Sequence, residues 1–119
     1  MAHGEFLRHA SDDPELASHV MHDYRNADLD PQTRAMLDYA TKLTREPTNM
    51  QEADVIALRE CGLTDEQILS VCLIACTFNF MTRLADGLGV EVPEERQKYV
   101  KTWLNSPARD QKWLMKAKD

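Results

Sequence analysis

Residues 64–89, TDEQILSVCLIACTFNFMTRLADGLG, decide the fold expected for this chain. The stretch opens with Thr64 and has Gln67 three residues later, a spacing at which each side chain can satisfy a free backbone N–H of the first helical turn. It closes on Gly87 and Gly89, and glycine suits the left-handed turn that ends helices. No proline lies between these signals. We expect one helix here, about twice as long as the mean globular helix.

Apolar residues surround the axis of this predicted helix instead of forming a stripe on one side. A helix that is apolar all round belongs inside a bundle or between subunits. We therefore expect an all-α bundle around one long buried helix. The apolar positions are Ile68, Leu69, Val71, Cys72, Leu73, Ile74, Ala75, Cys76, Phe78, Phe80, Met81, Leu84 and Ala85.

Chain length and composition favour one soluble globular domain over residues 1–119. The chain is 43% hydrophobic and 29% charged, which is typical of a folded protein. Its net charge of −6 argues against nucleic acid or an anionic membrane surface as a partner. The first ten residues contain no apolar signal segment. With three cysteines and no such segment, we expect free thiols in a reducing cytoplasm.

The apolar run of the central helix also raises the question of a membrane span. Asn79 and Arg83 interrupt it, and Asp65 and Glu66 precede it. We expect the run to be too short and too polar at its ends to cross a bilayer.

Caps, prolines and glycines predict the other helices. Pro14 suits a first helical turn, and the residue before Pro47 avoids helical angles, which ends a helix there. Asn49 or Thr48 is expected to cap the next helix, and Gly62 to stop it. The predicted segments are a short uncapped piece over residues 3–10, helices over 15–25, 31–46 and 49–61, and C-terminal helices within 92–119. No alternation of apolar and polar residues indicates a strand, and short connections favour antiparallel neighbours.

Two of the three cysteines, Cys72 and Cys76, lie four residues apart and would share one helix face. They could form a redox pair. However, they lie well inside the helix, away from the N-terminal dipole that lowers a thiol pKa, and among apolar neighbours. We favour structural packing for both, and packing or a surface position for Cys61.

A histidine pair offers a second candidate for chemistry. His19 and His22 follow Glu15 on one predicted helix, a spacing that can bind a transition metal. A closed metal site needs three or four oriented ligands, so we favour a structural role and expect no metal and no cofactor.

Polar residues recur on one side of the central helix at Asn79, Arg83 and Asp86. They could form the polar wall of a pocket or a helix-docking ion pair. Because a buried arginine is costly without a partner, we expect Asp86, or a carboxylate from another helix, to pair with Arg83.

Residues 13–91 resemble the alkylhydroperoxidase D-like, carboxymuconolactone-decarboxylase-like superfamily, in particular its peroxidase-related subgroup. The likeness is carried by residues 10–47, by residues 52–69, EADVIALRECGLTDEQIL, and by residues 78–91, FNFMTRLADGLGVE. The resemblance implies an all-α subunit that assembles into dimers or larger homo-oligomers.

The resemblance also implies thiol-dependent hydroperoxide reduction with a thiol reductant as partner. The family's Cys-x-x-Cys-x-x-x-His motif carries this chemistry. His3 would match its histidine, while both motif cysteines would fall before Met1. Cys72 and Cys76 match neither the position nor the spacing of the motif, so the family's role is not transferred to them.

Two functional hypotheses follow. The chain is a truncated or degenerate member whose peroxidase activity is impaired, acting as a non-catalytic oligomeric binding or scaffold domain. Alternatively, it is still an enzyme that uses His3 with Glu5, or Cys72 and Cys76 of a neighbouring subunit. An upstream continuation encoding the motif would make it a complete peroxidase.

Overall fold

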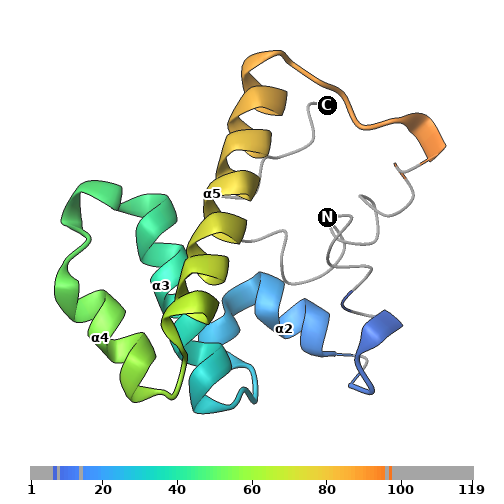
Figure 1. Ribbon diagram of the computed structural model, residues 1–119. Coiled ribbons are helices and arrows are strands. Elements are labelled where there is room, and N and C mark those ends of the chain that lie inside the picture. The colour runs from blue at the N-terminus through green and yellow to red at the C-terminus, as the bar shows by residue number, and fades with distance from the viewer. Residues whose placement is uncertain (1–6, 8, 14, 96, 98–119) are drawn as a thin grey trace. The chain divides into compact units, whose positions relative to one another are not determined.

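The computed structural model describes residues 7, 9–13, 15–95 and 97, and within them it contains helices and no strand (Figure 1). The all-α prediction is confirmed. His3, most of the piece over residues 3–10 and most of residues 92–119 lie outside the described residues. The α-helices with assigned bounds are α2 (Leu16–Asp23), α3 (Pro31–Arg45), α4 (Glu52–Glu60) and α5 (Asp65–Gly87). Two short 3-10 helices, η1 (Tyr24–Asn26) and η2 (Pro47–Asn49), follow α2 and α3.

The chain divides into two compact units, one formed by Met1–Asp28 with Glu91–Asp119 and the other by Leu29–Val90. In the first unit, α2 buries Ala17 completely, with Leu7 and Met21 packed against it. The single domain expected over residues 1–119 stays a prediction.

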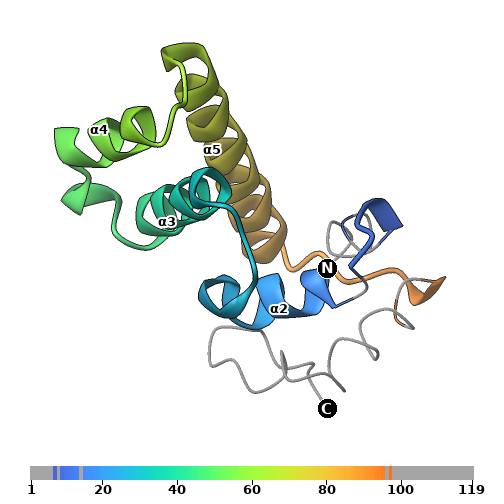
Figure 2. The same cartoon turned by 90° about the horizontal axis from the view of Figure 1, so that it is seen from below.

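The second unit is a three-helix arrangement in which α4 runs opposite to α3 and α5 (Figures 1 and 2). Its centre is formed by Leu58 of α4, Leu63 of the α4–α5 turn and Ile68 of α5, all less than 10% exposed. Residues of all three helices complete this core, namely Ala35, Met36, Tyr39, Val55, Cys61 and Val71. The reversals at short connections agree with the predicted antiparallel order of successive helices.

Local signals place the helix ends of this unit much as the sequence predicts. At the start of α5 the Gln67 backbone N–H donates to Thr64 Oγ1 over 3.3 Å, and the Thr64 N–H donates to Gln67 Oε1 over 2.9 Å. Gly62, with φ +89°, ends the turn after α4, and Gly89, with φ +64°, follows α5. Both angles lie in the left-handed region that glycine adopts without strain.

The predicted cap of α4 is wrong. Residues Pro47–Asn49 form a 3-10 turn, and the residue before the helix is Gln51. The Gln51 backbone N–H donates to Asp54 Oδ2 over 2.7 Å. Asp54 also lies 2.7 Å from Lys42 Nζ, so this carboxylate joins the start of α4 to α3.

The prediction of a buried central helix is wrong for the single chain. Of the residues of α5, only Ile68 is buried, whereas Leu73 is 57% and Phe80 64% exposed. The reason is geometric, because α3 and α4 lie on one side of α5 and no other helix of the second unit covers its opposite side (Figure 2). The alternative position expected for such a helix, between subunits, stays a prediction.

The length of α5 also corrects an expectation. With 23 residues and a window of mean hydropathy 1.7, α5 is long and apolar enough to cross a membrane by length and composition alone. The expectation that the run is too short is therefore wrong. Core helices of soluble proteins meet the same criterion, so the expected lack of a membrane partner is neither supported nor opposed by this feature.

Candidate functional site

The chemistry-bearing residues of the second unit meet along one line of contact between two helices, here called the α3/α5 seam. Since α3 and α5 run in the same direction, successive residues of one helix meet successive residues of the other (Figure 1). The seam consists of Tyr39 and Thr44 of α3 and Cys72 and Asn79 of α5, and Cys76 and Arg83 of α5 lie exposed beside it.

Asn79 holds the far end of the seam together. Its Nδ2 donates a hydrogen bond to Thr44 Oγ1 over 2.9 Å, and the Thr44 hydroxyl donates to the Ala40 carbonyl over 2.7 Å. Arg83 Nη1 donates to the Asn79 carbonyl over 3.3 Å. Asn79 is thus satisfied within the chain, which favours helix docking over the wall of a pocket.

The predicted ion pair between Arg83 and Asp86 does not form in the described part of the chain. Both residues are exposed, so Arg83 stays hydrated and needs no counter-charge. The premise that Arg83 is buried was therefore incorrect. Asp86 contributes its backbone carbonyl to the helix end, where it accepts a hydrogen bond from Gly89 N over 3.1 Å.

Tyr39 and Cys72 form the other end of the seam, and Cys76 lies beside it. Burial, followed by a hydrogen-bonding interaction with the Cys72 thiol, raises the pKa of Tyr39 to about 12. Cys76 is exposed, so the packing predicted for it is wrong. Partial loss of solvation, together with the hydrogen bond and charge of Cys72, nevertheless raises the pKa of its thiol. Each effect disfavours a negative charge at this point.

This environment makes Cys76 a poor nucleophile. Only the thiolate attacks a peroxide, and a pKa raised above the ordinary range leaves little thiolate at neutral pH. Neither cysteine lies at the start of α5, where the helix dipole would help, since Thr64 caps a helix that begins seven residues before Cys72. All three cysteines are free, and the Cys61 carbonyl accepts a hydrogen bond from Gln32 Nε2 over 3.1 Å.

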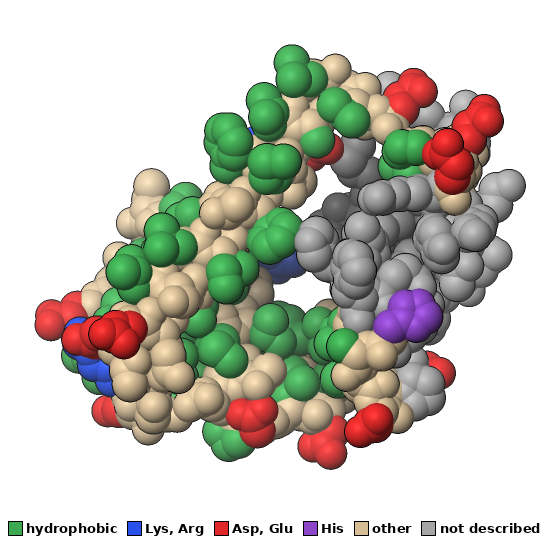
Figure 3. Space-filling view, turned by 45° about the vertical axis from the view of Figure 1, so that its right-hand side comes forward, with side chains coloured by type: hydrophobic (Ala, Val, Ile, Leu, Met, Phe, Trp, Pro, Cys, Tyr) green, Lys and Arg blue, Asp and Glu red, His purple; other side chains and the backbone are tan. Residues whose placement is uncertain are grey.

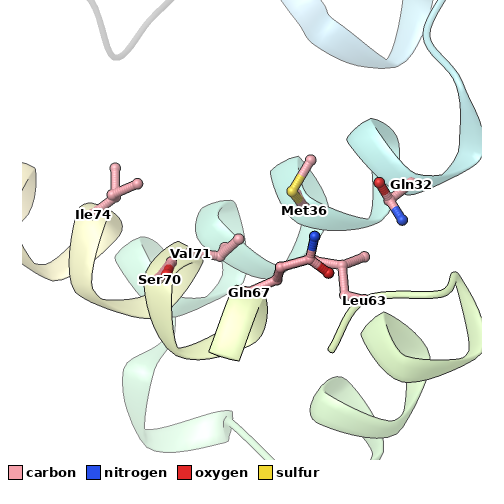
Figure 4. Close-up of a pocket in the computed structure, with 7 residues that line it drawn as sticks. All are labelled: Gln32, Met36, Leu63, Gln67, Ser70, Val71 and Ile74. Carbon is pink, nitrogen blue, oxygen red and sulfur yellow. The ribbon is translucent and has the colours of Figure 1, made fainter. Parts of the chain in front are cut away.

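A shallow apolar groove lies elsewhere between α3 and α5, with a volume of about 290 Å³ (Figure 4). Its polar groups already have partners, because Gln32 bonds to Cys61, Gln67 to Thr64, and Ser70 to Glu66. The sequence analysis did not identify the groove, although Val71 and Ile74 were among the apolar positions expected to be buried. The lining residues are Gln32, Met36, Leu63, Gln67, Ser70, Val71 and Ile74.

The histidine pair does not form a metal site in the described part of the chain. No group of three or more histidine, cysteine or acidic residues is close enough to hold an ion there. His19 is exposed and His22 is half-buried on α2.

Comparison with solved structures relates this arrangement of helices to two proteins. One is an uncharacterized peroxidase-related protein from Silicibacter sp. TM1040, with 36% identity over 79% of this chain and a TM-score of 0.73. The other, described as an alkylhydroperoxidase AhpD core and an uncharacterized peroxidase-related protein, is from Ralstonia eutropha JMP134, with 38% identity over 79% of this chain and a TM-score of 0.70. The chain belongs to the alkylhydroperoxidase D-like, peroxidase-related superfamily.

This alkylhydroperoxidase D-like chain spans about half the length of the two similar proteins, 49% of one and 50% of the other. No protein-family model and no curated protein sequence matched it. The family expected from residues 13–91 is thereby confirmed, and so is the fold.

Proposed function

We propose that this chain is an alkylhydroperoxidase-like protein in which thiol-dependent hydroperoxide reduction, the activity that the resemblance implies, is impaired. The observation that carries the proposal is the chemical environment of Cys72 and Cys76. The pKa of the Cys76 thiol is raised, both cysteines lie inside a helix, and Cys72 contacts a tyrosine instead of a base.

The reaction in question sets clear chemical requirements. Two thiols and one hydroperoxide become a disulfide, an alcohol and water, and a thiol reductant then restores the dithiol. The attacking sulfur must be a thiolate, and a second sulfur must come close enough to form the disulfide. Cβ atoms four residues apart on a helix are about 5–6 Å apart. A disulfide needs about 3.5–4.5 Å, so Cys72 and Cys76 could close one only by distorting α5.

Hydroperoxide turnover tests the proposal directly. The chain is incubated with an organic hydroperoxide and a dithiol reductant, and hydroperoxide loss is followed for the chain, for a Cys72→Ser/Cys76→Ser variant and for His3→Gln. We expect all three to match the rate of the reductant alone. Turnover lost in the double cysteine variant would show that this pair is catalytic after all. Turnover lost in His3→Gln would place the activity at the residue that matches the motif histidine.

A second candidate function is a non-catalytic, oligomeric scaffold. The many large apolar side chains exposed along α5 favour it, since a set of exposed apolar side chains on one element is typical of an interaction surface (Figure 3). Sedimentation velocity over a range of protein concentrations tests this candidate. A species larger than 13.6 kDa supports it, and a monomer at every concentration contradicts it.

A further inference from the structure

We propose that two copies of this chain pack their α5 helices antiparallel, about a two-fold axis that passes between Cys76 and Thr77. The proposal rests on the self-association proposed above and adds to it the surface and the register. The surface, here called the outer face of α5, consists of Leu69, Leu73, Phe80 and Leu84.

These four residues lie on one side of the helix and are open to solvent. Leu73, Phe80 and Leu84 follow Leu69 by 4, 11 and 15 residues. In a helix with 3.6 residues per turn, residues at these spacings lie on the same side. Leu69 is 59%, Leu73 57%, Phe80 64% and Leu84 45% exposed. Ile68, by contrast, is 7% exposed and packs with Leu58 and Leu63. Within the second unit, no described helix therefore covers the outer face.

The order of these residues is symmetric about one point of α5. Leu73 and Phe80 are equally far from the boundary between Cys76 and Thr77, and so are Leu69 and Leu84. A two-fold interface uses the same patch on both subunits. In an antiparallel pair centred on that boundary, Leu73 lies level with Phe80 of the partner subunit, and Leu69 lies level with Leu84 of the partner subunit. Every large apolar side chain of the outer face then meets another.

Two polar residues beside the outer face, Thr77 and Ser70, can leave water at little cost. The Thr77 hydroxyl donates to the Leu73 carbonyl over 2.8 Å, and the Ser70 hydroxyl donates to the Glu66 carbonyl over 2.9 Å. No charged residue occurs between Glu66 and Arg83. Few charges and an aromatic anchor are typical of the centre of a protein interface.

The size of the outer face suits a second copy. Two copies contribute eight large side chains, each about half exposed. Burial of their exposed apolar surface is the main source of free energy for such a contact.

Disulfide trapping tests the register. In a background with Cys61→Ser, Cys72→Ala and Cys76→Ala, the pair Leu73→Cys/Phe80→Cys is introduced and the protein is oxidised with oxidised glutathione. We expect most of the chain to migrate as a covalent dimer without reductant. The two new cysteines of one chain cannot pair with each other, because seven residues of helix separate them by about 10.5 Å. For the same reason each single variant, Leu73→Cys or Phe80→Cys, is expected to stay uncrosslinked in the antiparallel dimer.

The outcomes separate the register from self-association itself. Cross-linking of a single variant to its own copy would overturn the antiparallel register, since like residues would then face each other. An oligomer by sedimentation that the double variant does not trap would overturn the proposed surface while keeping the second candidate function. A monomer in solution would overturn both. Co-sedimentation of a monomer with phosphatidylcholine vesicles would identify a membrane as the occupant of the outer face and overturn the proposal.

Discussion

Asn79 of α5 donates a hydrogen bond from Nδ2 to Thr44 Oγ1 of α3 over 2.9 Å, joining residues 35 positions apart. The bond closes the end of the α3/α5 seam opposite to Tyr39. Because Asn79 is half-buried and Thr44 is exposed, this bond fixes how the helices dock without excluding water. It thereby gives Asn79 a structural role that its position in an apolar helix left undecided.

A double-mutant cycle on Asn79 and Thr44 tests that role. We expect Asn79→Ala and Thr44→Val each to lower the free energy of unfolding, with a coupling of about 0.5–1 kcal/mol, as for a solvent-accessible hydrogen bond. Urea unfolding of the wild type, both single variants and the double variant measures it. Additive effects, with no coupling, would show that the bond does not dock the helices.

The reactivity of Cys76 is expected to reflect its raised pKa. Because loss of solvation and Cys72 both disfavour the thiolate, alkylation of Cys76 by iodoacetamide should reach half its maximal rate at a pH above the ordinary thiol value of 9.0. Peptide mass spectrometry after timed labelling follows this one site. Cys72→Ala removes the hydrogen bond and the neighbouring charge, so it should lower the midpoint. A midpoint below pH 8 in the unaltered chain would contradict the environment described for this thiol.

Acid is expected to weaken the junction of α3 and α4 through Asp54. The hydrogen bond from Lys42 and that from Gln51 N hold the pKa of Asp54 below its ordinary value of 3.8. A carboxyl whose pKa is lowered by folding stabilises the fold above its unfolded pKa, and this contribution disappears as the pH falls through the folded pKa. We therefore expect the urea midpoint to fall between about pH 5 and pH 3.

Two variants separate Asp54 from the other acids. Asp54→Asn should be less stable at pH 7 and should show a flatter fall towards pH 3. Asp86→Asn, which removes an exposed carboxylate that takes part in neither contact, should follow the wild-type profile. Equal profiles for all three proteins would exclude Asp54 as a source of the acid sensitivity.

Leu58 is expected to dominate the stability of the second unit. It is only 1% exposed and contacts residues of the core formed by α3, α4 and α5. Leu58→Ala should lower the free energy of unfolding by about 3 kcal/mol, from lost burial and the remaining cavity. Ile56→Ala is a matched control on the same helix, where the side chain is 41% exposed, and should cost under ~1 kcal/mol. Similar losses for both variants would show that Leu58 is not the centre of this core.

The sequence by itself determined the helical class, the ends of α3 and α5, and the family. These features depend on local chemistry, such as the reciprocal cap between Thr64 and Gln67, the proline at residue 31 and the glycine at residue 89, or on likeness along the chain. The interpretation of Cys72 and Cys76 as a poor redox pair also depended on their position within one helix. The raised pKa of Cys76 agrees with this interpretation.

Only the tertiary structure decided which side of α5 is covered and which polar residues meet. An apolar sequence indicates that a helix can be buried. Which of its side chains are buried depends on where α3 and α4 lie, and these helices leave Leu73 and Phe80 exposed. In the same way, the sequence predicted an ion pair between Arg83 and Asp86. In the structure Arg83 is exposed to solvent, so its charge needs no partner. The contact of Asn79 with Thr44, and that of Tyr39 with Cys72, arise because α3 and α5 run side by side in the same direction, an arrangement that no local pattern specifies.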